Sequence, residues 1–227
     1  MDSVASQPTG GFRSNKLVQA WLVLVLAMGF GFALAGVQLV LGPIIEQNKL
    51  NETLEKVPGL VLGKALAAKM ADENQALAIT PRQVAVRKEE RSKYYSVYEA
   101  RYQDERRGWV VKAKGQGYAD VIELLVGISP DFATITGLFV LDQKETPGLG
   151  NKIIFEEWRN QFVDAPVDKK LTVVKTGATS PGKIDAVTGA TISSKSVTHI
   201  VNSAIDDLRE PLTAEDAEDG NKETDNG

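Results

Sequence analysis

A long uncharged segment near the N-terminus constrains the fold of this chain more than any other feature. From Leu17 to Ile45 no residue is charged, and the only strongly polar side chains are Gln19 and Gln38. The apolar core of a bilayer is about 30 Å thick, and a helix needs roughly 20 apolar residues to cross it. The sequence therefore predicts one transmembrane helix, over residues 17–42.

The residues in front of this segment indicate its orientation. Arg13 and Lys16 precede it directly, and basic residues beside a membrane helix favour the cytoplasmic side. We expect residues 1–16 to be cytoplasmic and the remainder to lie on the extracytoplasmic side of a bacterial inner membrane, as a single-pass protein. A cleaved signal peptide is the alternative, because Ala33 to Ala35 fits a small-residue cleavage site. The apolar run continues beyond that site, which favours an uncleaved anchor, and both alternatives export the domain.

The composition excludes several kinds of chemistry. The 227 residues include no cysteine, so a disulfide, a thiol nucleophile and a Cys-ligated iron–sulfur cluster are absent. A single histidine, His199, cannot build a histidine-rich metal site, and we predict neither a metal site nor catalytic residues. The formal net charge of -4 argues against nucleic acid as a partner. If the protein carries electrons, an organic cofactor must hold them.

The segments after the apolar run predict an α+β fold. Residues 43–90 have the pattern of a helical connector that Pro58 and Gly59 interrupt. Strand character recurs at Tyr94–Ala100, Trp109–Ala113, Val121–Ile128, Thr134–Leu141 and Val173–Val174. Lys152–Phe162 has apolar residues at helical spacing. Strands followed by helices favour a twisted, mostly antiparallel sheet with packed helices over residues 91–210. The acidic segment 211–227 should be a disordered tail.

A hydroxyl-rich turn stands where the last helix is expected to begin. It covers Asp185–Ser194, and apolar residues at helical spacing follow from Val197 to Leu208. Ser193 and Ser194 are candidate N-cap residues. A helix N-terminus offers unpaired N–H groups and a partial positive charge, so it favours an anion such as phosphate.

A second marked segment, Glu145–Gly150, reads Glu-Thr-Pro-Gly-Leu-Gly. Pro147 fixes one backbone dihedral, while Gly148 and Gly150 permit positive φ, so a tight loop should follow the strand that ends near Leu141. Taken alone, this segment is an ordinary connecting loop. Its interest comes from its combination with the hydroxyl-rich turn.

The hydroxyl-rich turn resembles the flavinylation motif of the covalent FMN-binding domain family. That motif is an Asp, two residues, Ser or Thr, and then Gly-Ala-Thr. The matching residues here are Asp185, Thr188, Gly189, Ala190 and Thr191. Family members carry FMN in phosphoester linkage to the closing threonine, so the resemblance implies covalent FMN on Thr191, with the neighbouring Ser193 as a second candidate acceptor.

The same family has a Glu-Thr-Pro-Gly-Leu-Gly segment upstream of that motif, followed by a helix with an aromatic residue. Trp158 and Phe162 match the aromatic helix. The resemblance implies that the flavin is lined by Glu145, Thr146, Gly148, Leu149 and Gly150.

Thr-Gly-Ala-Thr occurs twice, at 176–179 and at 188–191. Asp185 stands three residues before the second copy, while Val173 holds that place before the first. Pro181 follows the first copy and disfavours a helix there. We therefore assign 176–179 to a turn and the motif to the second copy.

Two kinds of membrane protein in this family share the layout of an N-terminal helix followed by both motifs. One is the G subunit of Rnf-type electron-transport complexes, which couple ferredoxin oxidation and NAD reduction to ion movement. The other is the C subunit of sodium-translocating NADH:quinone reductases. The short chain favours the G subunit. The resemblance implies an electron carrier that is not catalytic alone, with other membrane subunits as partners and a flavin transferase for maturation. An exported, non-redox scaffold module is the alternative from another class.

Overall fold

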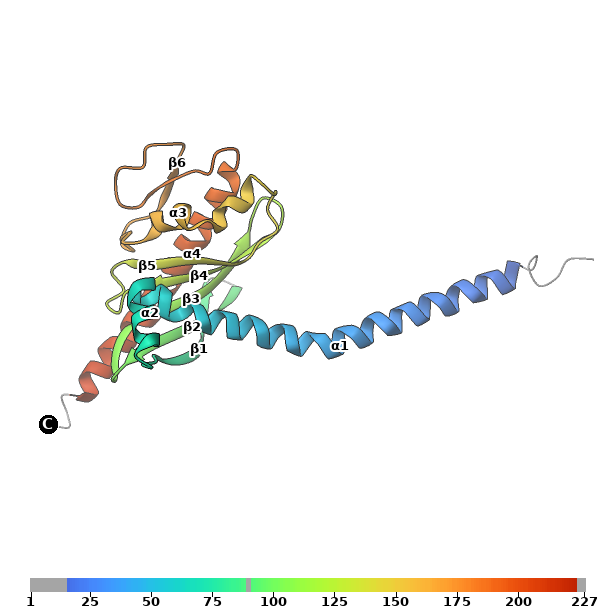
Figure 1. Cartoon of the computed structure of the whole chain (residues 1–227), viewed down its shortest axis with the longest axis horizontal. Coiled ribbons are helices and arrows are strands. Elements are labelled where there is room, and N and C mark those ends of the chain that lie inside the picture. Colours follow the sequence, from blue (N-terminus) through green and yellow to red (C-terminus); the bar gives the residue numbers. More distant parts are fainter. Residues whose placement is uncertain (1–15, 89–90, 224–227) are drawn as a thin grey trace, which may run out of the picture. The chain divides into compact units, whose positions relative to one another are not determined.

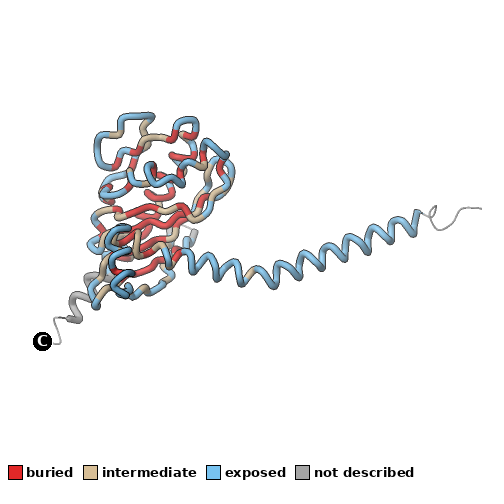
Figure 2. The backbone as a smooth tube through the Cα atoms, in the orientation of Figure 1, coloured by how far each residue is buried: buried red, intermediate tan, exposed pale blue. Residues whose placement is uncertain are grey.

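The computed structural model describes residues 16–88 and 91–223, and the chain divides into two units at Asn51. The first described element is helix α1, Lys16–Leu62, whose N-terminal part belongs to the first unit. This helix is long and apolar enough to cross a membrane. Nearly all residues of that part are exposed (Figure 2). They include its large apolar side chains, as a lipid-facing surface requires.

The end of α1 does not break at Pro58 and Gly59, so that expectation is wrong. The helix continues to Leu62. Val57 and Leu60 of this last part are buried in a cluster with residues of the sheet, and that packing outweighs the hydrogen bond that proline removes. A second short helix, α2, follows at Lys64–Asp72.

Five strands form one antiparallel sheet. They are β1 (Ala78–Lys88), β2 (Arg91–Tyr102), β3 (Glu105–Gln116), β4 (Val121–Ile128) and β5 (Ile135–Asp142). Their order in space is their order in sequence (Figure 1). Every neighbouring pair is antiparallel, which confirms the predicted antiparallel sheet. β1 corrects the helical connector predicted up to residue 90. It is an edge strand that contains Pro81, which an edge tolerates but which weakens the sequence signal of a strand.

The sheet buries apolar side chains on both faces, and buried residues run along its strands (Figure 2). On one face Trp109 and Leu124 belong to a core that includes Val201 and Leu208 of helix α4, Thr191–Glu223. On the other face a smaller cluster joins the sheet to the end of α1. The second unit is thus an α+β domain, as predicted.

The segment between β5 and α4 consists of short elements. In place of one helix over Lys152–Phe162, the chain forms three short turns of helix: η2 (Gly150–Ile154), α3 (Glu156–Arg159) and η3 (Asn160–Phe162). Phe155 has an extended backbone, at φ -71° and ψ 139°, and this interrupts the helix. Strands β6 (Thr172–Val174) and β7 (Lys183–Asp185) then pair in parallel.

The C-terminal helix is longer than expected. Residues 211–223 continue α4, where the sequence predicted a disordered tail. Leu212, 1% exposed, extends the apolar face of α4 onto the core by one more turn. Residues 224–227 of the predicted tail, and 1–15 of the predicted cytoplasmic segment, lie outside the described residues.

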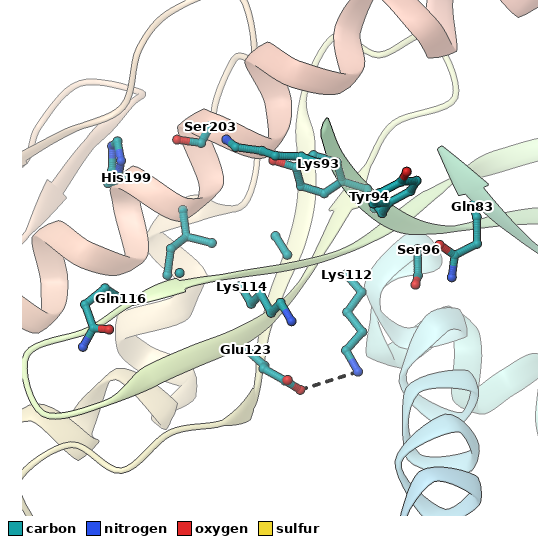
Figure 3. A pocket seen from close by; sticks show the side chains of 14 residues that line it. Gln83, Lys93, Tyr94, Ser96, Lys112, Lys114, Gln116, Glu123, His199 and Ser203 are labelled. Atoms are coloured by element: carbon teal, nitrogen blue, oxygen red, sulfur yellow. Dashed lines mark ion pairs between the residues drawn. The ribbon is translucent and has the colours of Figure 1, made fainter. Parts of the chain in front are cut away.

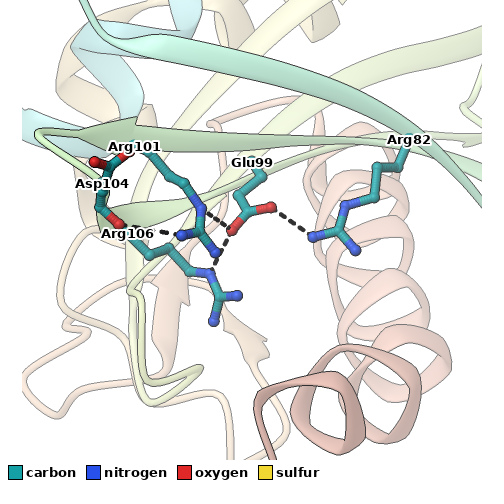
Figure 4. A network of polar contacts seen from close by, with 5 residues as sticks. All are labelled: Arg82, Glu99, Arg101, Asp104 and Arg106. Atoms are coloured by element: carbon teal, nitrogen blue, oxygen red, sulfur yellow. Dashed lines mark hydrogen bonds and ion pairs between the residues drawn. The ribbon is translucent and has the colours of Figure 1, made fainter. Parts of the chain in front are cut away.

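Glu99 anchors a polar network on the sheet (Figure 4). Its side chain is buried, and its carboxylate accepts hydrogen bonds from Arg82 Nη2 at 2.5 Å, Arg101 Nε at 2.7 Å and Arg106 Nε at 2.8 Å. Burial alone would raise the pKa of Glu99, but the three guanidinium groups outweigh burial and lower the pKa from 4.5 to about 2. The network ties β1, β2 and β3 together.

This network should make the domain sensitive to acid. Because the folded-state pKa of Glu99 is depressed, its contribution to stability is present above pH 4.5 and is lost as the pH falls towards about 2. In the Glu99→Gln variant we expect lower stability near neutral pH and a shallower loss of stability across that acid range. Urea unfolding at a series of pH values measures both. Glu55→Gln, at a mostly exposed side chain, is the control, and an equal effect in both variants would contradict the prediction.

Candidate functional site

Glu145 joins three segments that are far apart in the sequence. It follows β5 and is 4% exposed. Its Oε1 accepts hydrogen bonds from the N–H groups of Tyr118 at 2.9 Å and Ala119 at 3.1 Å. Its Oε2 accepts a hydrogen bond from Ser193 Oγ at 2.5 Å. The turn after β3, the Glu145–Gly150 loop and the start of α4 are thereby held at one place.

Two glycines let these segments approach closely. A Cβ added to Gly150 would lie 2.7 Å from Ser193 Oγ and 2.9 Å from Glu145 Cβ. Gly189 has φ +79°, and a Cβ there would lie 2.9 Å from Leu149 Cδ2. The two motifs are therefore neighbours in space.

We expect Gly189→Ala to loosen this junction. A left-handed backbone costs about 1–2 kcal/mol for a residue with a Cβ, and the added methyl group must also displace Leu149. Gly148→Ala is the matched control, because Gly148 has φ +75° but nothing within 4 Å of its added Cβ. Urea unfolding of both variants should show the larger loss in Gly189→Ala. When Leu149→Ala is already present, adding Gly189→Ala should cost no more stability than Gly148→Ala does in the parent. A larger loss in that double variant would contradict the contact between Gly189 and Leu149.

Helix α4 begins at Thr191, one residue after the buried Ala190. The first turn of a helix leaves its N–H groups without partners in the helix, and the end of this 33-residue helix carries a partial positive charge. Thr191 is partly exposed and stands at that end.

Ser193 and Ser194 do not serve as N-caps, which corrects the sequence-based expectation. Both lie inside α4 and are buried. Ser193 donates to Glu145, while Ser194 Oγ accepts the N–H of Val187 at 2.9 Å and donates to the carbonyl of Ala190 at 3.1 Å. The two buried hydroxyls thus hydrogen-bond to Glu145 and to the turn before the helix, and hold the start of α4 in place.

Asp185 lies apart from the Glu145 junction. Its backbone N–H donates to Gln161 Oε1 at 2.7 Å, and its carbonyl accepts from Trp158 Nε1 at 2.8 Å. Its Oδ1 accepts the N–H of Ala178 at 2.9 Å. The predicted aromatic segment thus fixes Asp185, and Asp185 in turn holds the first Thr-Gly-Ala-Thr copy, 176–179, which lies outside any helix.

The predicted site residues divide into a supporting layer and an exposed face. Glu145, Gly150 and Ala190 are buried beneath, and Asp185 and Thr191 are partly exposed. The exposed predicted residues are Thr146, Gly148, Leu149, Thr188 and Gly189. Ile192, which the sequence analysis did not single out, follows Thr191 and is also exposed. Leu149 is 44% exposed and Ile192 is 56% exposed. Such a face combines an anion-favouring helix end with hydroxyls and apolar side chains that suit a flat ring.

A domain family matches this part of the chain. Residues 117–206 match the FMN-binding domain family. The matched segment begins at the turn whose N–H groups bond Glu145 and ends within α4, so it contains the whole of the exposed face and its supporting layer.

The chain is similar to the G subunits of ion-translocating complexes. It is 49% identical over 100 residues to the G subunit of the ion-translocating oxidoreductase complex of Methanosarcina acetivorans, covering 44% of this chain and 50% of that protein. It is 41% identical over 100 residues to the G subunit of the proton-translocating ferredoxin:NAD(+) oxidoreductase complex of Clostridium ljungdahlii, covering 44% and 52%. The chain thus spans about half the length of these curated relatives.

Solved structures show the same fold. The crystal structure of Shewanella oneidensis NqrC superposes with a TM-score of 0.59 at 17% identity, covering 74% of this chain and 99% of that one. The C subunit of the Na(+)-translocating NADH-quinone reductase of Parabacteroides distasonis gives a TM-score of 0.59 at 21% identity, covering 75% and 96%. The shared fold thus covers about three quarters of this chain.

Proposed function

We propose that this chain is a membrane-anchored flavoprotein subunit of an ion-translocating ferredoxin:NAD oxidoreductase complex, and that it relays electrons through FMN joined to Thr191. One observation carries the proposal. Thr191 opens α4 directly beside the loop of the second motif, because Gly189 contacts Leu149 and Ser193 bonds Glu145. The chain does no substrate chemistry of its own.

The exposed face fits FMN. The first turn of α4 offers N–H groups and a partial positive charge to a phosphate, and Thr191 supplies a hydroxyl there. Gly148 has no side chain and Leu149 is apolar, so both would hold the flavin ring. When bound, FMN supplies electron transfer that this cysteine-free chain cannot perform with its own side chains.

Burial distinguishes the candidate acceptors. Ser193 is 2% exposed, and its hydroxyl already donates to Glu145. An enzyme that modifies it would have to break this buried contact. Thr191 is partly exposed and stands in the first turn of α4. Thr188 is exposed but lies outside the helix, before Gly189. Thr191 is thus the acceptor that combines access with the helix end.

Attachment requires a separate enzyme, because a threonine hydroxyl is a poor nucleophile without an adjacent base. A flavin transferase would use FAD with a divalent metal. In that reaction the phosphoanhydride bond of FAD would break with AMP as the leaving group, and the hydroxyl of Thr191 would lose its proton and form the phosphoester of FMN. Asp185 would be a recognition residue for that enzyme, positioned by Gln161 and Trp158.

The anchor and the names of the relatives support the remaining parts of the proposal. Helix α1 would hold the domain at a bacterial inner membrane, with Arg13 and Lys16 on the cytoplasmic side and the FMN-binding domain outside. Other membrane subunits of the complex would exchange electrons with the flavin. The C subunit of a sodium-translocating NADH:quinone reductase is the second candidate, because both solved structures compared above carry that name or its abbreviation.

Intact mass spectrometry of the full chain from its native membrane tests the proposal. We expect a mass increase of FMN less one water, and flavin fluorescence that stays with the chain in a denaturing gel. A colourless chain of unmodified mass, from cells with an active flavin transferase, would contradict the proposal and favour a non-redox scaffold. The same mass reports whether the N-terminus has been cleaved.

A further inference from the structure

Strands β2 and β3 are paired over only part of their length. The two strands pair from Tyr102 with Glu105 as far as Ser96 with Lys112. Beyond that pair, β2 continues to Arg91 but pairs only with β1, and β3 continues to Gln116 but pairs only with β4. Among the described residues, the facing edges of these two strand ends have no strand partner. Strand residues alternate the direction of their N–H and C=O groups, so about two residues of each edge present open backbone groups.

A cavity of about 720 Å³ lies between these strand ends (Figure 3). Its walls are the last pair, Ser96 and Lys112, and the ends of the two strands beyond it, residues 93–95 of β2 and 113–116 of β3. His199 and Ser203 of α4 form the third side. The cavity is therefore bounded by backbone edges on two sides and by a helix on the third.

Helix α4 holds the two strand ends apart. Tyr95 Oη and Lys93 Nζ both donate to Asp207 Oδ2, at 2.7 Å and 2.9 Å. β3 instead approaches α4 at Gly115, where an added Cβ would lie 2.6 Å from Ile200 Cγ1. Ile200 and Asp207 are seven residues apart, which is about 10 Å along a helix. The two strand ends therefore contact α4 at separate places, and the cavity lies in the opening between them.

The rim of the opening is basic. Lys93, Lys112 and Lys114 line it together with one carboxylate, Glu123. Lys112 Nζ lies 3.5 Å from Glu123 Oε2, and Lys93 is paired with Asp207. Lys114 forms no ion pair with any described residue. An acidic partner would meet complementary charge here.

We propose that the opening between β2 and β3 accepts an extended, acidic segment of a partner protein, which adds to the sheet as a strand. Backbone hydrogen bonds to both edges would supply affinity, and the lysines and the exposed Tyr94 would supply selectivity. Lysines on an open edge also prevent unwanted pairing. A purely protective role for these lysines predicts that no such segment binds.

Hydrogen exchange of the full chain in detergent tests the proposal. The probe is a capped heptapeptide of alternating glutamate and valine. We expect the amides of 92–96 and of 112–116 to gain protection together, as insertion between both strands requires. Two control peptides should each bind at least about threefold more weakly. The first has alternate N-methylated amides and cannot pair its backbone with the strands. The second has lysine in place of glutamate, which reverses the charge.

Two charge reversals complete the test. Lys114→Glu should weaken the glutamate peptide at least about threefold. Lys69→Glu, at an exposed lysine beside Tyr102 at the other end of β2, should leave binding unchanged. No protection of either strand end, or equal binding of all three peptides, would overturn the proposal. Protection that appears without peptide and rises with protein concentration would assign the opening to a second copy of the chain and would also overturn it.

Discussion

Thr191→Ala should abolish covalent flavin without unfolding the domain. The substitution removes the one partly exposed hydroxyl in the first turn of α4, and alanine is favourable in a helix. Protein produced with an active flavin transferase should lose the mass increase of FMN less one water. It should also lose its fluorescence in a denaturing gel, while its urea unfolding midpoint stays close to that of the parent apo-protein.

Three variants make this result specific to Thr191. Thr191→Ser keeps a hydroxyl and should retain part of the flavin. Thr179→Ala, in the first Thr-Gly-Ala-Thr copy, and Ser193→Ala, at a buried hydroxyl, should both keep it. Flavin retained in Thr191→Ala and lost in Ser193→Ala would move the attachment to Ser193.

Glu145→Ala should cause the largest loss of stability. It leaves the N–H groups of Tyr118 and Ala119 and the hydroxyl of Ser193 without their buried acceptor. An unsatisfied buried donor such as the Ser193 hydroxyl costs about 1–3 kcal/mol. The partly buried N–H groups of Tyr118 and Ala119 add less, because water can reach them, so we expect a total loss of about 3 kcal/mol. Urea unfolding followed by the fluorescence of the buried Trp109 and Trp158 measures it.

Glu145→Gln separates this supporting role from a role in contact with the flavin. Glutamine keeps an acceptor for the two N–H groups and can donate its amide to Ser193, so most of the stability should remain. If Glu145 only contacted the cofactor, both variants would unfold like the parent apo-protein and differ from it only in flavin retention. Equal destabilisation by alanine and glutamine would also contradict the supporting role.

The sequence predicted the central strands well and the peripheral elements poorly. β4 was placed at its observed bounds, because apolar residues on both faces and Gly117 before it give a strong local signal. β1 was missed because an edge strand with Pro81 has a weak pattern. The helix over Lys152–Phe162 failed at Phe155, whose extended backbone depends on the tertiary structure around it. The tail was expected to be disordered because its charge outweighs its few apolar residues, yet Leu212 reaches the core.

The sequence also led to both motif segments, and the structure brings Leu149 to Gly189 and Glu145 to Ser193. It could not reveal that Glu145 is enclosed by backbone donors, since Tyr118 and Ala119 contribute N–H groups that every residue type except proline possesses. Nor could it show that Asp185 is bonded to the other Thr-Gly-Ala-Thr copy. Both facts depend on contacts between segments distant in the sequence.

The order of the strands has a consequence for maturation. Each strand of the sheet pairs with its neighbour in the chain, and such local pairings form early in folding. The face around Thr191 instead joins the turn at 117–119, the loop at 145–150 and the start of α4, so it is completed only when the last helix docks. If FMN is attached to Thr191 as proposed, a transferase that recognises this face would modify only folded molecules, and the fraction of chains that carry flavin would measure how many have folded correctly.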